Sequence, residues 1–530
     1  MLGVIFEAFS KPLWLAFALI IIILFSWLRA LQSTFRVKTL GARYAPKIPT
    51  YLPFSLEFIY KSITAARKQR SFDLWHLLFS TYGTVDSPYT VEVNVGSRRF
   101  ILTADHEIIK AVLATQFSNF GKGETFNRQF HDFLGDSVFT TDGKEWHDSR
   151  QLIRPLFVNQ RIGDLEIFER HAQKLLSLIS GKGEITELQQ LFYRYTLDVA
   201  TDFMFGTTVG SLDNPQVKFA NAISEVQSVQ AILARSGPLY PFIPRKTYLK
   251  GLVIINSLIK PFVSRTLDLS PDELEKVSNT SSKEYTLLHA LARSTRNPKK
   301  IRDELVNLLF AGRDTTAATL SWLFYELAGH PSVVRKLRSE IISVLGDDCN
   351  KAPKPEDLKK MKYLHHTVDE TLRLYPPVPF NIRSALSDTM IATPNSPRPL
   401  YIQKGDSVAF STLVLHRRAD LHPPPSQSFA PVDQFSPERW DAWTPRPWTY
   451  IPFNGGPRIC IGQQFALREI WFTVCRILQR FERLERVEIP SPGDGGGRDE
   501  RVQFMKTEIV GTPGRKVRVR FWESDGACHE

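Results

Sequence analysis

The sequence predicts a mainly α protein with a small β-rich part, preceded by one N-terminal transmembrane helix. Apolar residues recur at helical spacing through most of the chain between about residues 55 and 374. Stretches that read as strands are short and few, and one uncharged apolar stretch lies near the N-terminus. We therefore expect a membrane anchor at 1–32, a basic, proline-rich connector at 33–54, and one large folded domain at 55–530.

The expected anchor is the stretch Pro12–Leu28, whose 17 residues include no charged side chain. As a helix it would be roughly 26 Å long, close to the hydrocarbon thickness of a thin bilayer. Trp14 and Trp27 stand near its ends, where aromatic rings favour the membrane interface. The alternatives are a buried core helix and a cleaved signal peptide. A signal peptide begins with basic residues, whereas here the basic residues follow the apolar stretch.

The charges around this stretch predict its orientation. The basic residues that follow it are Arg29, Arg36, Lys38, Arg43 and Lys47, with no acid before Glu57. The positive-inside rule then puts the rest of the chain in the cytosol. The segment Ala45–Phe54 contains three prolines, which is typical of a semi-rigid connector.

The body of the chain reads as helices with a few strands. Helical patterns cover Phe58–Arg70, His106–Gln116, Gln151–Phe157, Asp164–Ser180, Ile185–Phe205 and Asn214–Ala234. A strand pair is expected at Val91–Val95 and Arg99–Leu102, with a Gly-Ser turn between them. Shorter strands are expected at Leu400–Ile402 and Ser407–Ala409. The polar segment Pro271–Lys283 is expected to be an exposed loop.

The net charge of +12 and the pI of about 9.4 bear on partners. A basic balance suits nucleic acid, an anionic membrane surface or an acidic partner protein. No run of basic residues is dense enough to indicate nucleic acid, so no nucleic acid is expected as a partner. The four cysteines include no CxxC pair, which argues against a structural zinc site.

The stretch FNGGPRICIGQQFA carries the most informative pattern, formed by Phe453, Gly456, Arg458, Cys460 and Gly462. A helical pattern follows it directly, and a thiolate at a helix N-terminus is stabilised by the backbone amides and dipole. The glycines permit tight turns and let a flat ligand approach the backbone. Taken alone, the cysteine would be read as a buried core residue, the usual fate of a free cysteine.

These residues together match F-x-x-G-x-R-x-C-x-G, and the sequence here resembles the cytochrome P450 superfamily. The resemblance implies haem b as the cofactor, with Cys460 as the thiolate ligand of its iron. It implies that Arg458 pairs with a haem propionate and that Phe453 packs beneath the thiolate. Gly456 would permit the turn, and Gly462 would permit close contact between helix and haem. It also implies one mainly helical domain with a small β-rich part.

A second motif, AGRDTT, lies within a long apolar helical pattern at Ile301–Gly329. Charged residues inside such a helix are costly to bury, so solvent-facing side chains are the alternative. In the family this motif forms the distal wall above the iron. The resemblance implies that Thr315 holds a hydrogen-bonded water next to bound oxygen and that Asp314 feeds protons to it. Gly312 would make room for oxygen.

A third motif, E-x-x-R, places Glu370 and Arg373 on one helix face, where they can pair. A surface ion pair would stabilise little. The family pattern implies instead a buried pair joined by a downstream arginine, here Arg439. The neighbouring Trp440 departs from the phenylalanine that is commoner there.

Further resemblances concern the haem propionates. Trp146 and Arg150 match the W-x-x-x-R of the family. Arg383 in NIRSA and His416 in LHRR resemble further propionate contacts. The resemblance therefore implies a cofactor-binding set that is spread over much of the chain.

The resemblance implies a monooxygenase that inserts one oxygen atom of O₂ into a C–H bond of an apolar small molecule. Electrons would come from NADPH through a membrane-bound NADPH–cytochrome reductase at the endoplasmic reticulum, with the catalytic domain facing the cytosol. An acidic docking face on that reductase would suit the basic chain. Isomerases and dehydratases of the family often lack the acid–threonine pair that this chain keeps. A haem carrier without turnover, and a membrane protein without haem, are the remaining alternatives.

The motif stretches look most like fungal members that hydroxylate the terminal carbon of alkanes and fatty acids. The alternative is a tailoring oxidase of fungal secondary metabolism, acting on a terpenoid, polyketide or alkaloid. A narrow apolar channel would serve the first function. The candidates for its wall are Phe117, Phe120, Phe126, Phe130, Val378 and Phe380; ordinary core packing is their alternative role.

Overall fold

The computed structural model describes residues 35–96, 98–157, 165–216, 218–279, 285–426, 429–488 and 505–523. The expected anchor at 1–32 lies outside these residues. Among the residues described, no helix is both long enough and apolar enough to cross a bilayer. The expected domain at 55–530 is described over most of its length.

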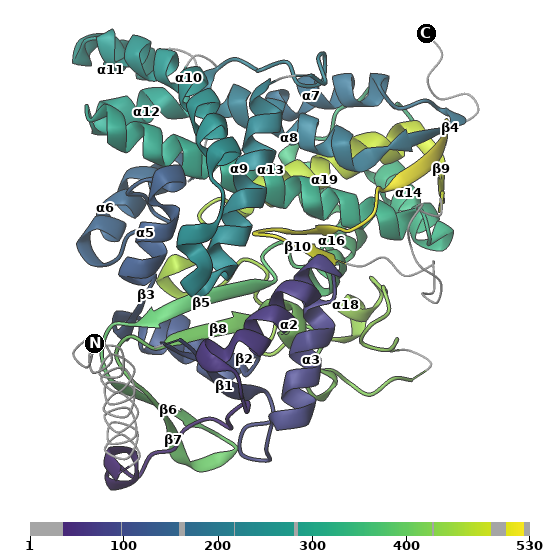
Figure 1. Ribbon diagram of the computed structural model, residues 1–530. Coiled ribbons are helices and arrows are strands. Elements are labelled where there is room, and N and C mark those ends of the chain that lie inside the picture. Colours follow the sequence, from purple (N-terminus) through teal and green to yellow (C-terminus); the bar gives the residue numbers. More distant parts are fainter. Residues whose placement is uncertain are drawn as a thin grey trace, which may run out of the picture.

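Helices make up most of the molecule (Figure 1). They are α2 (Leu56–Arg67), α3 (Ser71–Tyr82), α4 (His106–Lys110), α5 (Gly123–Leu134), α6 (Gly143–Ile153), α7 (Glu166–Ser177), α8 (Leu188–Phe205), α9 (Lys218–Arg235), α10 (Lys246–Asp268), α11 (Pro271–Asn279), α12 (Leu287–Ser294), α13 (Pro298–Leu327), α14 (Pro331–Leu345), α15 (Pro355–Lys360), α16 (Lys362–Leu374), α17 (Thr412–Leu415), α18 (Arg439–Ala442) and α19 (Gln463–Arg480). The longest of them, α13, runs through the helical part (Figure 1). Its start is capped by Asn297, whose side chain accepts the backbone N–H groups of Lys299 and Lys300.

The strands form small sheets. They are β1 (Thr90–Val95), β2 (Arg98–Thr103), β3 (Phe120–Gly121), β4 (Lys182–Glu187), β5 (Phe380–Ala385), β6 (Thr389–Thr393), β7 (Ser396–Ile402), β8 (Ser407–Ser411), β9 (Phe481–Arg486), β10 (Met505–Thr507), β11 (Gly511–Pro513) and β12 (Arg518–Glu523). The largest sheet has the order β1-β2-β8-β5-β3, in which only β2 and β8 run parallel. It lies beside α2 and α3 at the opposite end of the molecule from α11 (Figure 1). The mainly helical architecture with a small β-rich part is thus confirmed.

The main core lies where α7, α8, α13, α14, α16 and α19 pack together. Leu320, Phe324, Leu372 and Phe472 are among its buried residues. Burying such side chains contributes about 1.5–3 kcal/mol each. Because α13 and α19 share this core, the two segments that carry the AGRDTT motif and the cysteine loop are held in fixed relation.

Two local expectations were wrong. The segment expected to be a loop forms α11 over Pro271–Asn279. Its start is a capping box: the Glu273 carboxylate accepts the Ser270 N–H at 2.7 Å, and the Ser270 hydroxyl accepts the Glu273 N–H at 3.2 Å. Ile185 lies in strand β4, paired with Arg520 of β12, and not at the start of a helix. The expected strand pair near residue 96 is confirmed as β1 and β2.

The E-x-x-R pair is fully buried and is joined by a second arginine. Arg373 binds Glu370 through two hydrogen bonds, Nε to Oε2 at 2.8 Å and Nη2 to Oε1 at 2.9 Å. Arg439 Nε lies 3.3 Å from Glu370 Oε1. The indole N–H of Trp440 donates to Glu370 Oε2 at 3.1 Å. The tryptophan that departs from the family pattern therefore adds a donor to this carboxylate and ties α16 to α18.

Candidate active site

A cavity lies between α13, the start of α19, α6 and β5, with about 1510 Å³ of space not filled by protein atoms and part of it open to solvent. Gly312 and Thr315 line it from α13, and Cys460 and Gly462 line it from the segment before α19. Most of the other lining residues are apolar. The cavity therefore joins the segments that carry the sequence motifs.

The cysteine loop is shaped by close backbone approaches. The N–H of Cys460 donates to the carbonyl of Phe453 at 3.0 Å. Gly456 has φ +68°, and a Cβ on it would stand 1.9 Å from the carbonyl oxygen of Leu113. Only glycine fits there, as the sequence predicted. The loop presents Cys460 to the cavity just ahead of the N-terminus of α19.

Cys460 is exposed, but to the interior of the cavity, where protein surrounds it on most sides. Burial therefore raises the pKa of its thiol, while a backbone hydrogen bond from Gly462 and the charge of Arg150 oppose the rise. Arg150 is held near by a hydrogen bond from Nη1 to the carbonyl of Ile459 at 3.1 Å. A metal ion that binds this sulfur must displace its proton, and these two groups favour the thiolate.

Three cations gather at one side of the cavity: Lys122, Arg383 and Arg458, all among its lining residues. Burial lowers the pKa of Arg458 to about 10 and that of Arg383 to about 9, and it lowers the pKa of Lys122 well below its usual value. Mutual repulsion adds to the shift at Lys122 and Arg383. Of the acids in the described part of the chain, Asp142 counters their charge and binds Arg458 Nη2 at 2.5 Å.

Arg458 also lies over the Trp146 ring at 4.7 Å and donates to the carbonyl of Thr141 at 2.9 Å. Its buried Nε and Nη1 atoms have no protein partner among the described residues. Buried donors without partners are costly, so a group that supplies acceptors is expected beside them. The cation cluster therefore suits an anionic ligand such as a pair of carboxylates.

The cavity walls also suit a flat ligand. A Cβ added at Gly312 would meet no heavy atom within 4 Å, and one added at Gly462 would meet only a Phe157 ring carbon at 3.7 Å. Both additions would extend into the cavity. A thiol, a neighbouring set of cations and two glycines without side chains fit haem: Cys460 would ligate the iron, and the cations would hold the propionates. The fold and the site thus define a haem-thiolate protein.

The comparisons with known proteins agree. Residues 49–497 match the family described as Cytochrome P450. Cytochrome P450 monooxygenase pvhE of Talaromyces variabilis is 42% identical, covering 95% of this chain and 94% of its own. Cytochrome P450 52A13 of Debaryomyces hansenii is 37% identical over 82% of this chain and 84% of its own. The crystal structure of the cytochrome P450DA haem domain shares the fold, with a TM-score of 0.71, 20% identity, and coverage of 91% of this chain and 98% of that one. The chain belongs to the cytochrome P450 family and is a haem-thiolate monooxygenase.

The structure brings most of the remaining predicted residues together. Trp146, Arg150, Arg383 and Phe453 all line the cavity, and their roles toward haem remain predictions. His416 does not line it. Its ring is buried, and its Nε2 accepts the backbone N–H of Ile451 at 2.9 Å, so the expected propionate contact is corrected to a structural hydrogen bond. Burial lowers the pKa of His416 to about 3, so the ring is neutral.

The two residues predicted to be catalytic, Asp314 and Thr315, lie on α13. Thr315 lines the cavity, and its hydroxyl donates to the carbonyl of Ala311 at 2.6 Å. Asp314 is buried behind it, bound by Arg313 Nη1 at 2.8 Å and by the side-chain amide of Gln227. Burial raises the pKa of Asp314, and Arg313 and Gln227 oppose the rise. Arg313 and Asp314, whose burial inside a helix would be costly for either charge alone, therefore pair with each other.

Sequence reasoning missed Lys122 and Asp142. The Asp142 carboxylate accepts the N–H of Lys122 at 2.8 Å and that of Gly123 at 2.7 Å, so it holds the turn before α5 beside Arg458. No local pattern marks either residue.

Of the six candidates for the channel wall, Val378 alone lines the cavity, whereas Phe139 and Val138 line it and were not expected. Phe126 and Phe130 stack on each other at 4.3 Å, and Phe380 packs on Trp75 at 5.1 Å.

Thr315→Ala is expected to uncouple NADPH consumption from product formation, because the hydroxyl of this cavity-lining residue is lost while haem binding is retained. Product formation should fall on the order of 100-fold, as for loss of a proton-transfer group. NADPH consumption and product are measured together. Thr315→Ser, which keeps the hydroxyl, should stay coupled. An unchanged product-to-NADPH ratio in Thr315→Ala would contradict the assigned role.

Proposed function

We propose that this monooxygenase hydroxylates the terminal carbon of a long-chain fatty acid or alkane. The observation that carries the proposal is the composition of the cavity wall: away from the cation cluster it is lined by apolar side chains such as Val138, Phe139, Leu287 and Leu308. An aliphatic chain fits such a surface, because every buried CH₂ contributes about 0.8 kcal/mol. The resemblance of the motif stretches to alkane- and fatty-acid-hydroxylating members supports the same substrate class.

Separate residues of this chain would bind haem and supply protons. Bound haem supplies the iron chemistry that activates O₂. Cys460 would ligate the iron, and Arg458, Arg383 and Trp146 would hold the anionic edge of the ring. The Thr315 hydroxyl can accept a hydrogen bond from water in the cavity. Asp314, whose raised pKa lets its carboxyl hold a proton more readily, lies behind Thr315 as the proton source.

A second candidate is a tailoring oxidation in fungal secondary metabolism. The relative named monooxygenase pvhE is similar over almost the whole chain, and the apolar cavity wall would also suit a compact polycyclic substrate. Reconstitution with an NADPH–cytochrome reductase and a long-chain fatty acid, followed by mass spectrometry, separates the two. Terminal hydroxylation coupled to NADPH consumption supports the first candidate. An intact haem-thiolate CO spectrum without product favours the second.

We also propose that residues 1–32 anchor the enzyme in the endoplasmic-reticulum membrane. The catalytic domain then faces the cytosol, where a membrane-bound NADPH–cytochrome reductase delivers electrons. The uncharged stretch and the basic residues after it support this orientation. The net charge of +12 suits an acidic docking face.

Removal of residues 1–32 is expected to release most of the protein into the soluble fraction, because the apolar stretch supplies the membrane affinity. Fractionation of cells that express the full and truncated chains measures the release, and the CO spectrum of the soluble fraction is the control for folding. Complete retention of the truncated chain in membranes would contradict the proposed anchor.

A further inference from the structure

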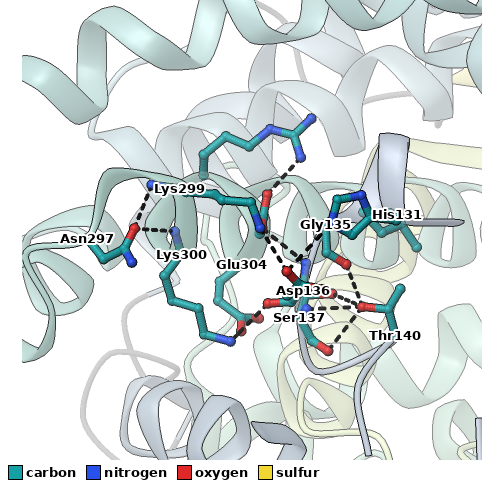
Figure 2. A network of polar contacts seen from close by, with 12 residues as sticks. His131, Gly135, Asp136, Ser137, Thr140, Asn297, Lys299, Lys300 and Glu304 are labelled. Atoms are coloured by element: carbon teal, nitrogen blue, oxygen red, sulfur yellow. Dashed lines mark hydrogen bonds and ion pairs between the residues drawn. The ribbon is translucent and has the colours of Figure 1, made fainter. Parts of the chain in front are cut away.

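The start of α13 makes a buried polar junction with the loop at residues 135–141, which connects α5 to α6. Figure 2 shows Lys300 and Glu304 of α13 pointing toward Asp136 and Ser137 of this loop. Within the loop, the Thr140 hydroxyl donates to the carbonyl of Gly135 at 2.6 Å. The loop is thus a compact turn that is fastened to the first turns of α13.

Asp303 provides the first attachment. Its side chain is buried, and its Oδ2 accepts the backbone N–H of Asp136 at 3.1 Å. A Cβ at Gly135, where φ is +59°, would stand 2.0 Å from this carboxylate. Glycine at 135 therefore lets the loop backbone approach Asp303 closely. Arg302 Nη1 at 2.9 Å and Lys299 Nζ at 3.4 Å balance the charge of Asp303.

Glu304 and Lys300 provide the second attachment. Glu304 is completely buried, with Lys300 Nζ at 3.1 Å from its Oε1 and the N–H of Val138 at 3.4 Å from its Oε2. Lys300 Nζ also donates to the carbonyl of Asp136 at 2.9 Å and to the hydroxyl of Ser149 at 2.5 Å. Because Ser149 belongs to α6, this ion pair joins three elements: α13, the loop and α6.

All three joined elements line the cavity. The loop contributes Val138 and Phe139, and Phe139 keeps 37% of its surface exposed. Helix α6 contributes Trp146 and Arg150, and Arg150 directly follows Ser149. A shift of the junction would therefore move the apolar wall relative to the haem-binding residues.

We propose that Asp303 and Glu304 are positioning residues that fix the apolar wall formed by Val138 and Phe139, and that they thereby select which ligands extend along that wall. Neither residue lines the cavity; both act through the backbone N–H groups of the loop. The inference rests on the family assignment, and it shares with the proposed function only the idea that the apolar wall contacts substrate.

The test measures ligand binding to the haem protein by its optical difference spectrum and does not depend on the true substrate. Imidazole probes the iron alone, and 1-dodecylimidazole probes the iron and the apolar wall. The variant Glu304→Gln keeps the side-chain size but removes the counter-charge of Lys300, whose side chain is only 26% exposed. We expect its affinity for 1-dodecylimidazole to fall by about tenfold, while that for imidazole changes less than about twofold.

Controls separate the alternatives. Glu124→Gln, at an exposed acid of α5 that pairs with Arg128, should leave both affinities unchanged. Ser149→Ala removes the hydroxyl that binds Lys300 and Glu304 but keeps both charges. It should shift the same ratio in the same direction, which keeps the proposal testable if Glu304→Gln does not fold. The proposal is overturned if folded variants show an unchanged ratio of the two affinities, whether both stay constant or both fall by the same factor. Failure of the wild type to oxidise fatty acids would reject the proposed substrate without affecting this result.

Discussion

Cys460→Ala is expected to abolish the absorption band of the reduced, CO-bound haem-thiolate and to reduce turnover to background. The variant removes the cavity-facing sulfur, and no other cysteine of the described residues lines the cavity. The cation cluster and the glycine walls remain, so some haem is still expected to bind without its thiolate. The two measurements are the reduced CO difference spectrum and the rate of substrate-dependent NADPH oxidation.

Cys475→Ala is the matched control. Cys475 lies on α19 and is buried in the main core, with its Sγ 3.3 Å from Met361 Sδ. Burial raises the pKa of its thiol. Its loss should leave a small cavity and an unchanged CO spectrum. A wild-type CO spectrum in Cys460→Ala would show that another group ligates the iron.

Glu370→Gln is expected to give the largest loss of stability among single substitutions outside the cavity. Two buried arginines, Arg373 and Arg439, would lose their counter-charge, and the Trp440 indole would lose a charged acceptor. Removing one partner of a buried ion pair costs about 3–5 kcal/mol of unfolding free energy. The cysteine loop should be affected as well, because Tyr450, which precedes it, donates to Asp369 beside Glu370 at 3.1 Å.

The urea midpoint and the yield of haem-loaded protein measure this effect. Glu124→Gln is the comparison, since Glu124 and Arg128 are both largely exposed and such pairs contribute little. A midpoint close to that of wild type in Glu370→Gln would show that the buried network does not support the fold as its geometry indicates.

Several features were predictable because contiguous residues encode them. The cysteine loop depends on glycine at 456, on a cysteine just ahead of a helix, and on the amides of that helix, all within one stretch. The strand pair β1 and β2 is likewise local, and so is the pairing of Glu370 with Arg373 one helical turn away. Helix α11 is equally local, because Ser270 and Glu273 form a capping box within one helical turn; the polar composition of the segment nevertheless favours a loop.

Other features depended on segments that meet only in the folded chain. Ile185 became a strand residue because β12 pairs with it from more than 300 positions away, which overrides its local helical pattern. The LHRR stretch around His416 resembles a propionate contact, yet in the folded chain the ring accepts the backbone N–H of Ile451. The sequence by itself determined the haem-thiolate class, since sulfur, turn and helix lie in one stretch. Tertiary structure alone decided the cation cluster of Lys122, Arg383 and Arg458 and the junction at Glu304, because burial and charge balance arise only once distant segments are packed together.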